Sequence, residues 1–347
     1  MLIAHRTNDS QAVAAEMDGK VLEVDDICIT VEYNDGKQSA IKKYPLGRKY
    51  GRHEGGTYPN DLASNVKAGQ KFKQGDILVY NTKHFEPDLI TPTQVNWKAG
   101  PVVSGYFFES ADTLDDSSAI DIEASKLLTA ETSKVKCIFV SFKDDVHNLI
   151  KPGTAVTPET ILCSIEDPLT ANQDVFSEES KHALLEITDR SPKAGVSGTI
   201  DKIEVFYNGQ LEDMSDSIRD IAKYGDRIRK KEASVNPLTM AANGQVDGSL
   251  RLDGKPVEID TLVMRMYITH ASEAIGGDKA VVANQMKSTF KRRMIGVNKT
   301  EDGRPINLIF GKKSIDERIV YSVYQIGTAM TYGRLMAEGA RQIAGRG

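Results

Sequence analysis

Basic side chains are concentrated in one stretch of an otherwise acidic chain. Of the 44 basic and 49 acidic residues, ten basic and only four acidic ones lie between Lys279 and Arg318. Lysine is a compact counter-charge for phosphate, and arginine can hold two phosphate oxygens at once. A chain that repels nucleic acid overall but is locally basic is expected to grip phosphates at one defined place. The alternative is a solvated basic face. The ten are Lys279, Lys287, Lys291, Arg292, Arg293, Lys299, Arg304, Lys312, Lys313 and Arg318.

The spacing of cations within this stretch indicates phosphate chemistry. Lys279 closes a Gly-Asp-Lys sequence, and seven residues separate it from Lys287. The sequence D-G-R-P at 302–305 predicts a tight turn before an apolar strand, and Arg318 lies beyond that strand. In phosphoryl transfer, such cations position a triphosphate and offset the charge that develops on the leaving pyrophosphate.

Three charged residues further upstream are candidates for the same chemistry. Arg52 lies in a glycine-bracketed stretch at 51–56, where it is either a phosphate ligand or a solvated loop charge. Asp115 and Asp116 follow a β-type run. Adjacent carboxylates offer the hard oxygen ligands that a divalent ion prefers, but they also cap helix N-termini. The sequence leaves both interpretations open.

The composition limits the classes of protein to which the chain can belong. Its 347 residues are enough for two or three modules. No run approaches the roughly 18 apolar residues that a membrane span needs, and the first ten residues are too polar for a secretory signal. The three cysteines are widely spaced, which predicts reduced cytoplasmic thiols. The six histidines never share a helix turn, so a histidine-based metal site has no support.

The elements that must position these groups are mostly strands. The stretches 66–78 and 150–162 share one pattern, with a glycine three residues after an aliphatic residue, an apolar residue three further on, and an Ile-Leu pair. The glycine supplies a turn and the apolar residues face a core, so both predict hammerhead-like modules of orthogonal β-hairpins. Lipoyl and biotinyl carriers use such pieces, but nothing here resembles their modifiable lysine. We expect an α+β, mostly β fold.

Other elements follow from periodicity and turn residues. The stretch 209–256 reads as an insertion, with a charge-dense helix at 213–233 that bears one narrow apolar stripe. The stripe is either a docking face or packs on the parent domain. Further expected elements are helices at 11–17 and 178–188, a helix that ends near Ile343, strands at 21–24, 27–33 and 262–268, and a turn at Asn34-Asp35-Gly36.

These motifs together resemble the β-subunit family of multisubunit DNA-dependent RNA polymerases. In that family, a G-D-K-M-A-G-R-H-G-N-K-G signature precedes a D-G-x-P-V-D-I-V strand and an arginine, and the stretch 277–318 is similar at the same spacing. The likeness continues upstream in the same order. It includes the family's K-Y-x-R-S-N at 49–52, its V-K-x-G-x-x-V-K-K-G-D-I-L at 66–78, its E-D-S/A at 115–117, its later hairpin at 150–162 and its G-V-S-G-x-V strand at 195–206.

The resemblance implies a fold and a role for each candidate. It implies a double-psi β-barrel with hammerhead or barrel-sandwich hairpin modules. In this fold Lys279 and Lys287 would contact the RNA 3′ end and the nucleotide phosphates. Arg52 and Arg318 would meet the incoming triphosphate. The Asp115-Asp116 pair would lie beside the second Mg²⁺.

The same resemblance implies domains and partners. Residues 1–208 would begin a hybrid-binding domain, 209–256 would form a short flap-like insertion, and 257–347 would complete the barrel. The chain has no D-x-D-x-D triad, so the catalytic Mg²⁺ is expected to be held mainly by a β′-like partner. Further expected partners are a β N-terminal-half subunit, the DNA template, the RNA transcript, NTPs and a promoter-specificity factor, with no membrane.

The extent of the likeness and its departures suggest two further expectations. Only the carboxy-terminal half of a β subunit is represented, which favours a split subunit of the giant-bacteriophage type over a piece of a longer chain. The expected location is then the cytoplasm of an infected bacterial cell, or the virion. Between the lysines, the family's Gly/Arg/His-rich run is replaced, and Ser288 stands where the family has a glycine. A non-catalytic nucleic-acid-binding or assembly module of the same fold is therefore the alternative function.

Overall fold

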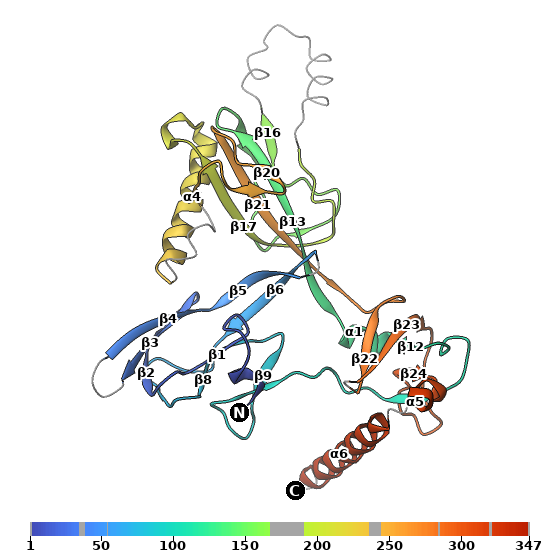
Figure 1. The fold of residues 1–347 in the computed structure, drawn as a ribbon. Coiled ribbons are helices and arrows are strands. Elements are labelled where there is room, and N and C mark those ends of the chain that lie inside the picture. Colours follow the sequence, from blue (N-terminus) through green and yellow to red (C-terminus); the bar gives the residue numbers. More distant parts are fainter. Residues whose placement is uncertain are drawn as a thin grey trace, which may run out of the picture. The chain divides into compact units, whose positions relative to one another are not determined.

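The chain folds into two compact, discontinuous units. The structure is a computed structural model, and it describes residues 2–34, 39–53, 55–166, 191–235, 244–283, 285–318 and 321–345. Unit 1 comprises residues 1–98 and 131–271, and unit 2 comprises residues 99–130 and 272–347. These units divide the chain at other positions than the sequence-based boundaries at 208 and 256. Strands dominate the described residues, in agreement with an α+β, mostly β class (Figure 1).

Unit 1 contains a nine-stranded sheet and a four-stranded sheet. The larger sheet runs β1-β8-β6-β13-β21-β17-β15, with β5 on β6 and β18 on β17, and the smaller one runs β4-β3-β2-β7. β-branched and aromatic residues alternate with polar ones along β3, so Ile29, Val31 and Tyr33 all face one buried core.

The elements of unit 1 are, in chain order, η1 (Ile3–His5), β1 (Ala12–Ala14), β2 (Gly19–Val24), β3 (Cys28–Asn34), β4 (Ser39–Pro45), β5 (Gly47–His53), β6 (Gly56–Ala63), β7 (Lys71–Phe72), β8 (Ile77–Asn81), β9 (Phe85–Pro87), β10 (Val95–Trp97), β13 (Ala130–Ser141), β14 (Asp145–His147), β15 (Ala155–Val156), β16 (Ser164–Glu166), β17 (Gly198–Asn208), η2 (Leu211–Asp213), α4 (Asp216–Ala233), β18 (Gly244–Gln245), β19 (Arg251–Leu252), β20 (Lys255–Pro256) and β21 (Thr261–Ser272).

The two repeated sequences adopt the same local structure in unit 1. The glycine of each repeat has a left-handed backbone, with φ of +82° at Gly69 and +88° at Gly153. Only glycine adopts this conformation at little cost. Three residues later, Phe72 and Val156 are both 4% exposed. Each apolar residue pairs with a glycine of a longer strand, so the two repeats share a turn and a short paired strand, and the orthogonal hairpins stay a prediction. The paired strand glycines are Gly19 and Gly198.

The predicted helix of the insertion is α4, and it packs on its own unit. Ile218, Ala222 and Gly225 are its buried residues. A Cβ on Gly225 would lie 2.8 Å from the Cβ of Val205 in β17, so helix and strand approach closely. Tyr224, by contrast, is 38% exposed. Of the two interpretations of the stripe, packing on the parent domain is the one that the structure supports.

Unit 2 contains a five-stranded mixed sheet with the order β11-β24-β12-β23-β22. β11 pairs with β24 and β12 with β23 in parallel, whereas the other two pairs are antiparallel. The apolar residues of one face, among them Ile120, Phe290 and Phe310, form the core of the unit. The elements are β11 (Gly105–Phe107), β12 (Ser117–Asp121), α1 (Ile122–Leu127), β22 (Lys279–Val282), β23 (Met286–Met294), β24 (Leu308–Phe310), α5 (Lys312–Arg318) and α6 (Ser322–Ala344).

Several expectations need correction or stay open. No sheet among the described residues closes on itself, so the double-psi β-barrel is not confirmed. The helix expected at 11–17 is instead strand β1, because pairing with β8 and burial override the local helix propensity. The expected helix at 178–188 and residues 35–36 of the expected turn lie outside the described residues, although β3 and β4 on either side of that turn pair antiparallel. Within the described part of the chain, no helix is long and apolar enough to cross a membrane.

Candidate functional site

The β22–β23 hairpin of unit 2 places Lys279 and Lys287 on one face. Lys279 pairs with Thr289, and Val281 pairs with Lys287. Directly paired residues point to the same side of a sheet, as do residues two apart on one strand, so these four side chains share a face. Both lysines are exposed. The intervening residues of β23 face the core instead, since Met286, Ser288 and Phe290 are each 3% exposed. Because one face of the hairpin is buried in the core, the opposite face, which carries Lys279 and Lys287, is exposed to solvent.

The basic neighbours of these two lysines on β23 have partners within the chain. Lys291, on the same face of β23, donates a hydrogen bond to the carbonyl of Ala111, and Arg292 forms an ion pair of 2.6 Å with Asp112. Among the residues that the structure describes, Lys279 and Lys287 have no hydrogen-bond or ion-pair partner. Their positive charges are therefore available to an external anion.

Asp115 and Asp116 form a turn that leads directly into β12. Both have left-handed backbones, with φ of 51° and 65°. They do not cap a helix, which corrects one of the two interpretations of this pair. Helix α1 is capped instead by Asp121, whose carboxylate accepts a hydrogen bond of 2.7 Å from the N–H of Ala124. The next residue, Ser117, pairs with Thr289 of β23, so the acidic turn lies at the end of the row that contains Lys279.

Arg52 lies in unit 1, at the end of β5, where it lines a pocket of about 470 Å³. Two more arginines line this pocket, Arg251 of the β19–β20 hairpin and Arg265 of β21. Arg52 is exposed and has no hydrogen-bond or ion-pair partner within the described parts of the chain. Sequence reasoning missed the other two arginines, because β19, β20 and β21 meet Arg52 only through the tertiary fold.

Arg265 is held in place by a buried carboxylate. Its guanidinium donates to Glu204 from Nε at 2.8 Å, and Tyr267 donates to the same carboxylate at 3.0 Å. Burial is the largest single influence and lowers the pKa of Arg265, but the charge and hydrogen bond of Glu204, together with the charges of Tyr267 and Cys137, raise this pKa above its ordinary value. The pocket also contains Cys137, whose thiol pKa is raised by burial. With Glu204 neutralising Arg265, the accessible positive charge comes from Arg52 and Arg251.

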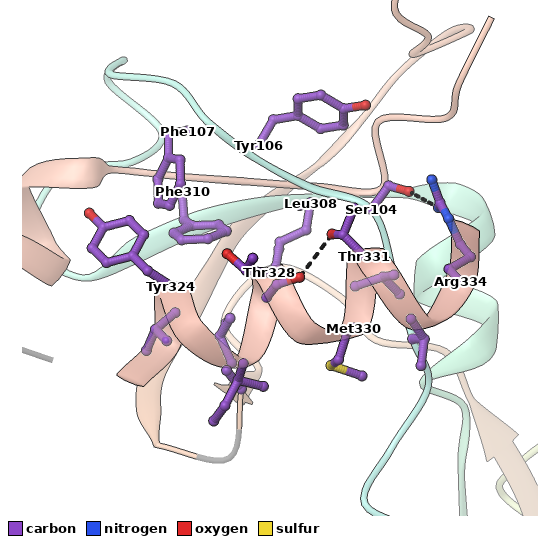
Figure 2. Close-up of a pocket in the computed structure, with 18 of the residues that line it drawn as sticks. Ser104, Tyr106, Phe107, Leu308, Phe310, Tyr324, Thr328, Met330, Thr331 and Arg334 are labelled. Carbon is purple, nitrogen blue, oxygen red and sulfur yellow. Dashed lines mark hydrogen bonds between the residues drawn. The ribbon is translucent and has the colours of Figure 1, made fainter. Parts of the chain in front are cut away.

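A second, more apolar pocket in unit 2 was not anticipated from the sequence. It has a volume of about 680 Å³ and lies between α6 and the segment 101–107. At one end, the Phe107 ring lies 4.8 Å from the Phe310 ring, and Tyr324 lies nearby (Figure 2). At the other end, Arg334 donates a hydrogen bond of 3.1 Å to Ser104 (Figure 2). The sequence predicts the helix that ends near Ile343, but it gives no signal for the pocket beside it.

The structure thus brings together four of the six predicted site residues. Lys279, Lys287, Asp115 and Asp116 lie on neighbouring strands and a turn of unit 2, while Arg52 belongs to unit 1. Arg318 ends α5, and its side chain lies outside the described residues. Among the described residues, no group of three or more His, Cys, Asp or Glu side chains is arranged so that it could hold a metal ion.

Comparison with known proteins gives one partial relationship. No protein-family profile matches the chain. It is similar to the β subunit of DNA-directed RNA polymerase from Thermus aquaticus, with 35% identity over 105 residues. The match spans 30% of this chain and 9% of the length of that subunit. Over this stretch, the chain is related to an RNA polymerase β subunit.

Proposed function

We propose that this chain is a subunit of a multisubunit DNA-directed RNA polymerase. In this proposal it binds the RNA–DNA hybrid and the phosphates of the incoming NTP, and it is inactive alone. The partial relationship to a polymerase β subunit supports a general role of this kind. The observation that carries the finer assignment is the exposed face of the β22–β23 hairpin, where Lys279 and Lys287 have no partner among the described residues.

The geometry of that face suits a polyanion. On an antiparallel hairpin, diagonal neighbours such as Lys279 and Lys287 have Cβ atoms within about 8 Å of each other. That spacing lets two ammonium groups contact consecutive phosphates, or the phosphate of an RNA end and that of a nucleotide. Each contact is a charge-assisted hydrogen bond. When negative charge develops on the leaving pyrophosphate, cations held in place beforehand stabilise it without reorganisation.

The remaining residues would extend the same function. Arg52, with Arg251, offers a second cationic site for a phosphate group in unit 1. We propose the triphosphate as the ligand of Arg52 and Arg318, and a place beside the second Mg²⁺ for the acidic turn. Mg²⁺ would supply Lewis-acid chemistry, held mainly by a β′-like partner. We further propose a β N-terminal-half partner and an enzyme of the split-subunit, giant-bacteriophage type.

Purification of the native complex tests this proposal. A tagged chain expressed with the other proteins of its source should co-purify with a chain that bears a D-x-D-x-D sequence. The complex should extend an RNA primer on a DNA template, and the isolated chain should not. A complex that binds nucleic acid but contains no such partner and incorporates no nucleotide would favour the non-catalytic assembly module instead. The other chains in the complex would show whether the subunit is split and whether a promoter-specificity factor is bound.

A further inference from the structure

Ser288 links the acidic turn to the strand that carries Lys287. Its side chain is only 3% exposed. Its Oγ lies 3.1 Å from the backbone carbonyl oxygen of Asp116 and 2.6 Å from the Oγ of Ser118. A carbonyl can only accept, and each hydroxyl carries one proton. Ser288 is the donor in both contacts, so its one proton is shared between the carbonyl of Asp116 and the hydroxyl of Ser118.

The same carbonyl receives a second hydrogen bond from β23. The backbone N–H of Thr289 donates to the Asp116 oxygen at 3.1 Å. Two consecutive residues of β23, directly after Lys287, thus hold one carbonyl of the turn. That turn needs restraint, because aspartate adopts the left-handed conformation as a single residue, whereas Asp115 and Asp116 adopt it in succession.

We propose that Ser288 is a positioning residue, which sets the Asp115–Asp116 turn against the lysine face for the nucleotide-addition reaction. The inference rests on the proposed polymerase function. The side chain of Ser288 is buried on the opposite face of β23 from Lys287, so it reaches no substrate and acts only through the turn.

The test compares three variants in the assembled polymerase. Ser288→Ala removes the hydroxyl, and Ser288→Thr restores it on a residue that suits a strand. Ser125→Ala is the matched control, because Ser125 is also fully buried in unit 2 and bonds a backbone carbonyl, that of Ala274, at 2.5 Å. Loss of one hydrogen bond predicts that kcat/KM for the NTP falls about fivefold in Ser288→Ala. The threonine variant should recover most of this loss, and the control should stay within about twofold of wild type.

A second readout reports the geometry without relying on catalysis. Hydrogen exchange of the Thr289 amide, measured on the full chain, should be faster in Ser288→Ala and unchanged in Ser125→Ala. Ser118→Ala should not accelerate it, because Ser288 can then donate its proton to the carbonyl alone. Wild-type exchange at Thr289, wild-type kcat/KM in Ser288→Ala, or a threonine variant as impaired as the alanine one would each overturn the positioning role.

Failure of the polymerase function itself would be seen elsewhere. In that case the assembled wild-type complex would add no nucleotide, or lysine variants of the exposed face would elongate normally. The exchange effect at Thr289 would persist under either outcome, because it depends only on the contacts within unit 2.

Discussion

Replacing Lys287 or Lys279 by alanine is the sharpest test of the basic face. Both side chains are exposed and have no partner among the described residues, so each substitution should change the free energy of unfolding by no more than about 0.5 kcal/mol. Assembly should therefore be preserved. Any loss of activity can then be assigned to the missing positive charge.

The size of the loss follows from the surroundings of the charge. An ammonium and a phosphate oxygen 4 Å apart interact by about 1 kcal/mol in bulk water and about 4 kcal/mol at an effective dielectric constant of 20. The lysines of the free chain are near the first limit. A site closed over by nucleic acid and a partner subunit is near the second. A charge-assisted hydrogen bond of about 1.5–3 kcal/mol lies between them and predicts a loss of roughly 10- to 150-fold per lysine.

The assay is single-nucleotide addition by the assembled complex on a preformed RNA–DNA scaffold. Lys126→Ala is a suitable control, because Lys126 is an exposed lysine of the same unit that pairs with Glu123 at 3.1 Å, on helix α1. If a lysine contacts the polynucleotide, its removal should also reduce the slope of log affinity against log salt by about 0.9 for duplex-like nucleic acid. Near-normal addition rates in both Lys279→Ala and Lys287→Ala would refute the role of this face.

Three further predictions concern unit 1. The raised pKa of the Cys137 thiol predicts that maleimide labelling keeps accelerating as pH rises through 9, and pyrophosphate should slow the labelling in wild type but not in Arg251→Gln. Arg48, which bonds Asp61 at 2.7 Å, lowers the pKa of that carboxyl. The resulting stability is present at neutral pH and is lost as the pH falls through the lowered pKa of Asp61. In urea denaturation, the Arg48→Gln variant should therefore be less stable than wild type by about 1 kcal/mol at pH 7. This difference should vanish in acid. Gly225→Leu should separate α4 from its sheet, seen as faster hydrogen exchange across α4, whereas leucine at an exposed position of the helix should not.

Much of the fold could be predicted because its signals are local. The alternation of β-branched and polar residues in β3, and the glycine turns of the two repeats, depend on residues next to each other in the chain. The same holds for the charge-dense helix α4. The prediction failed at 11–17, where β1 forms only because β8 provides a partner. It also failed to place the acidic pair, since Asp-Asp-Ser suits a helix cap and a turn equally well.

Sequence alone determined that this chain concentrates positive charge near its carboxyl end and that two lysines stand eight positions apart, because charge and spacing are properties of the linear chain. Tertiary structure decided that both lysines share an exposed face, that Ser288 holds the acidic turn beside them, and that Arg251 and Arg265 join Arg52. The first depends on burial of one face of the β22–β23 hairpin, and the other two bring together strands that are far apart in sequence. Such pairing is selected by burial of a common core, and no local pattern encodes which distant strand will be the neighbour.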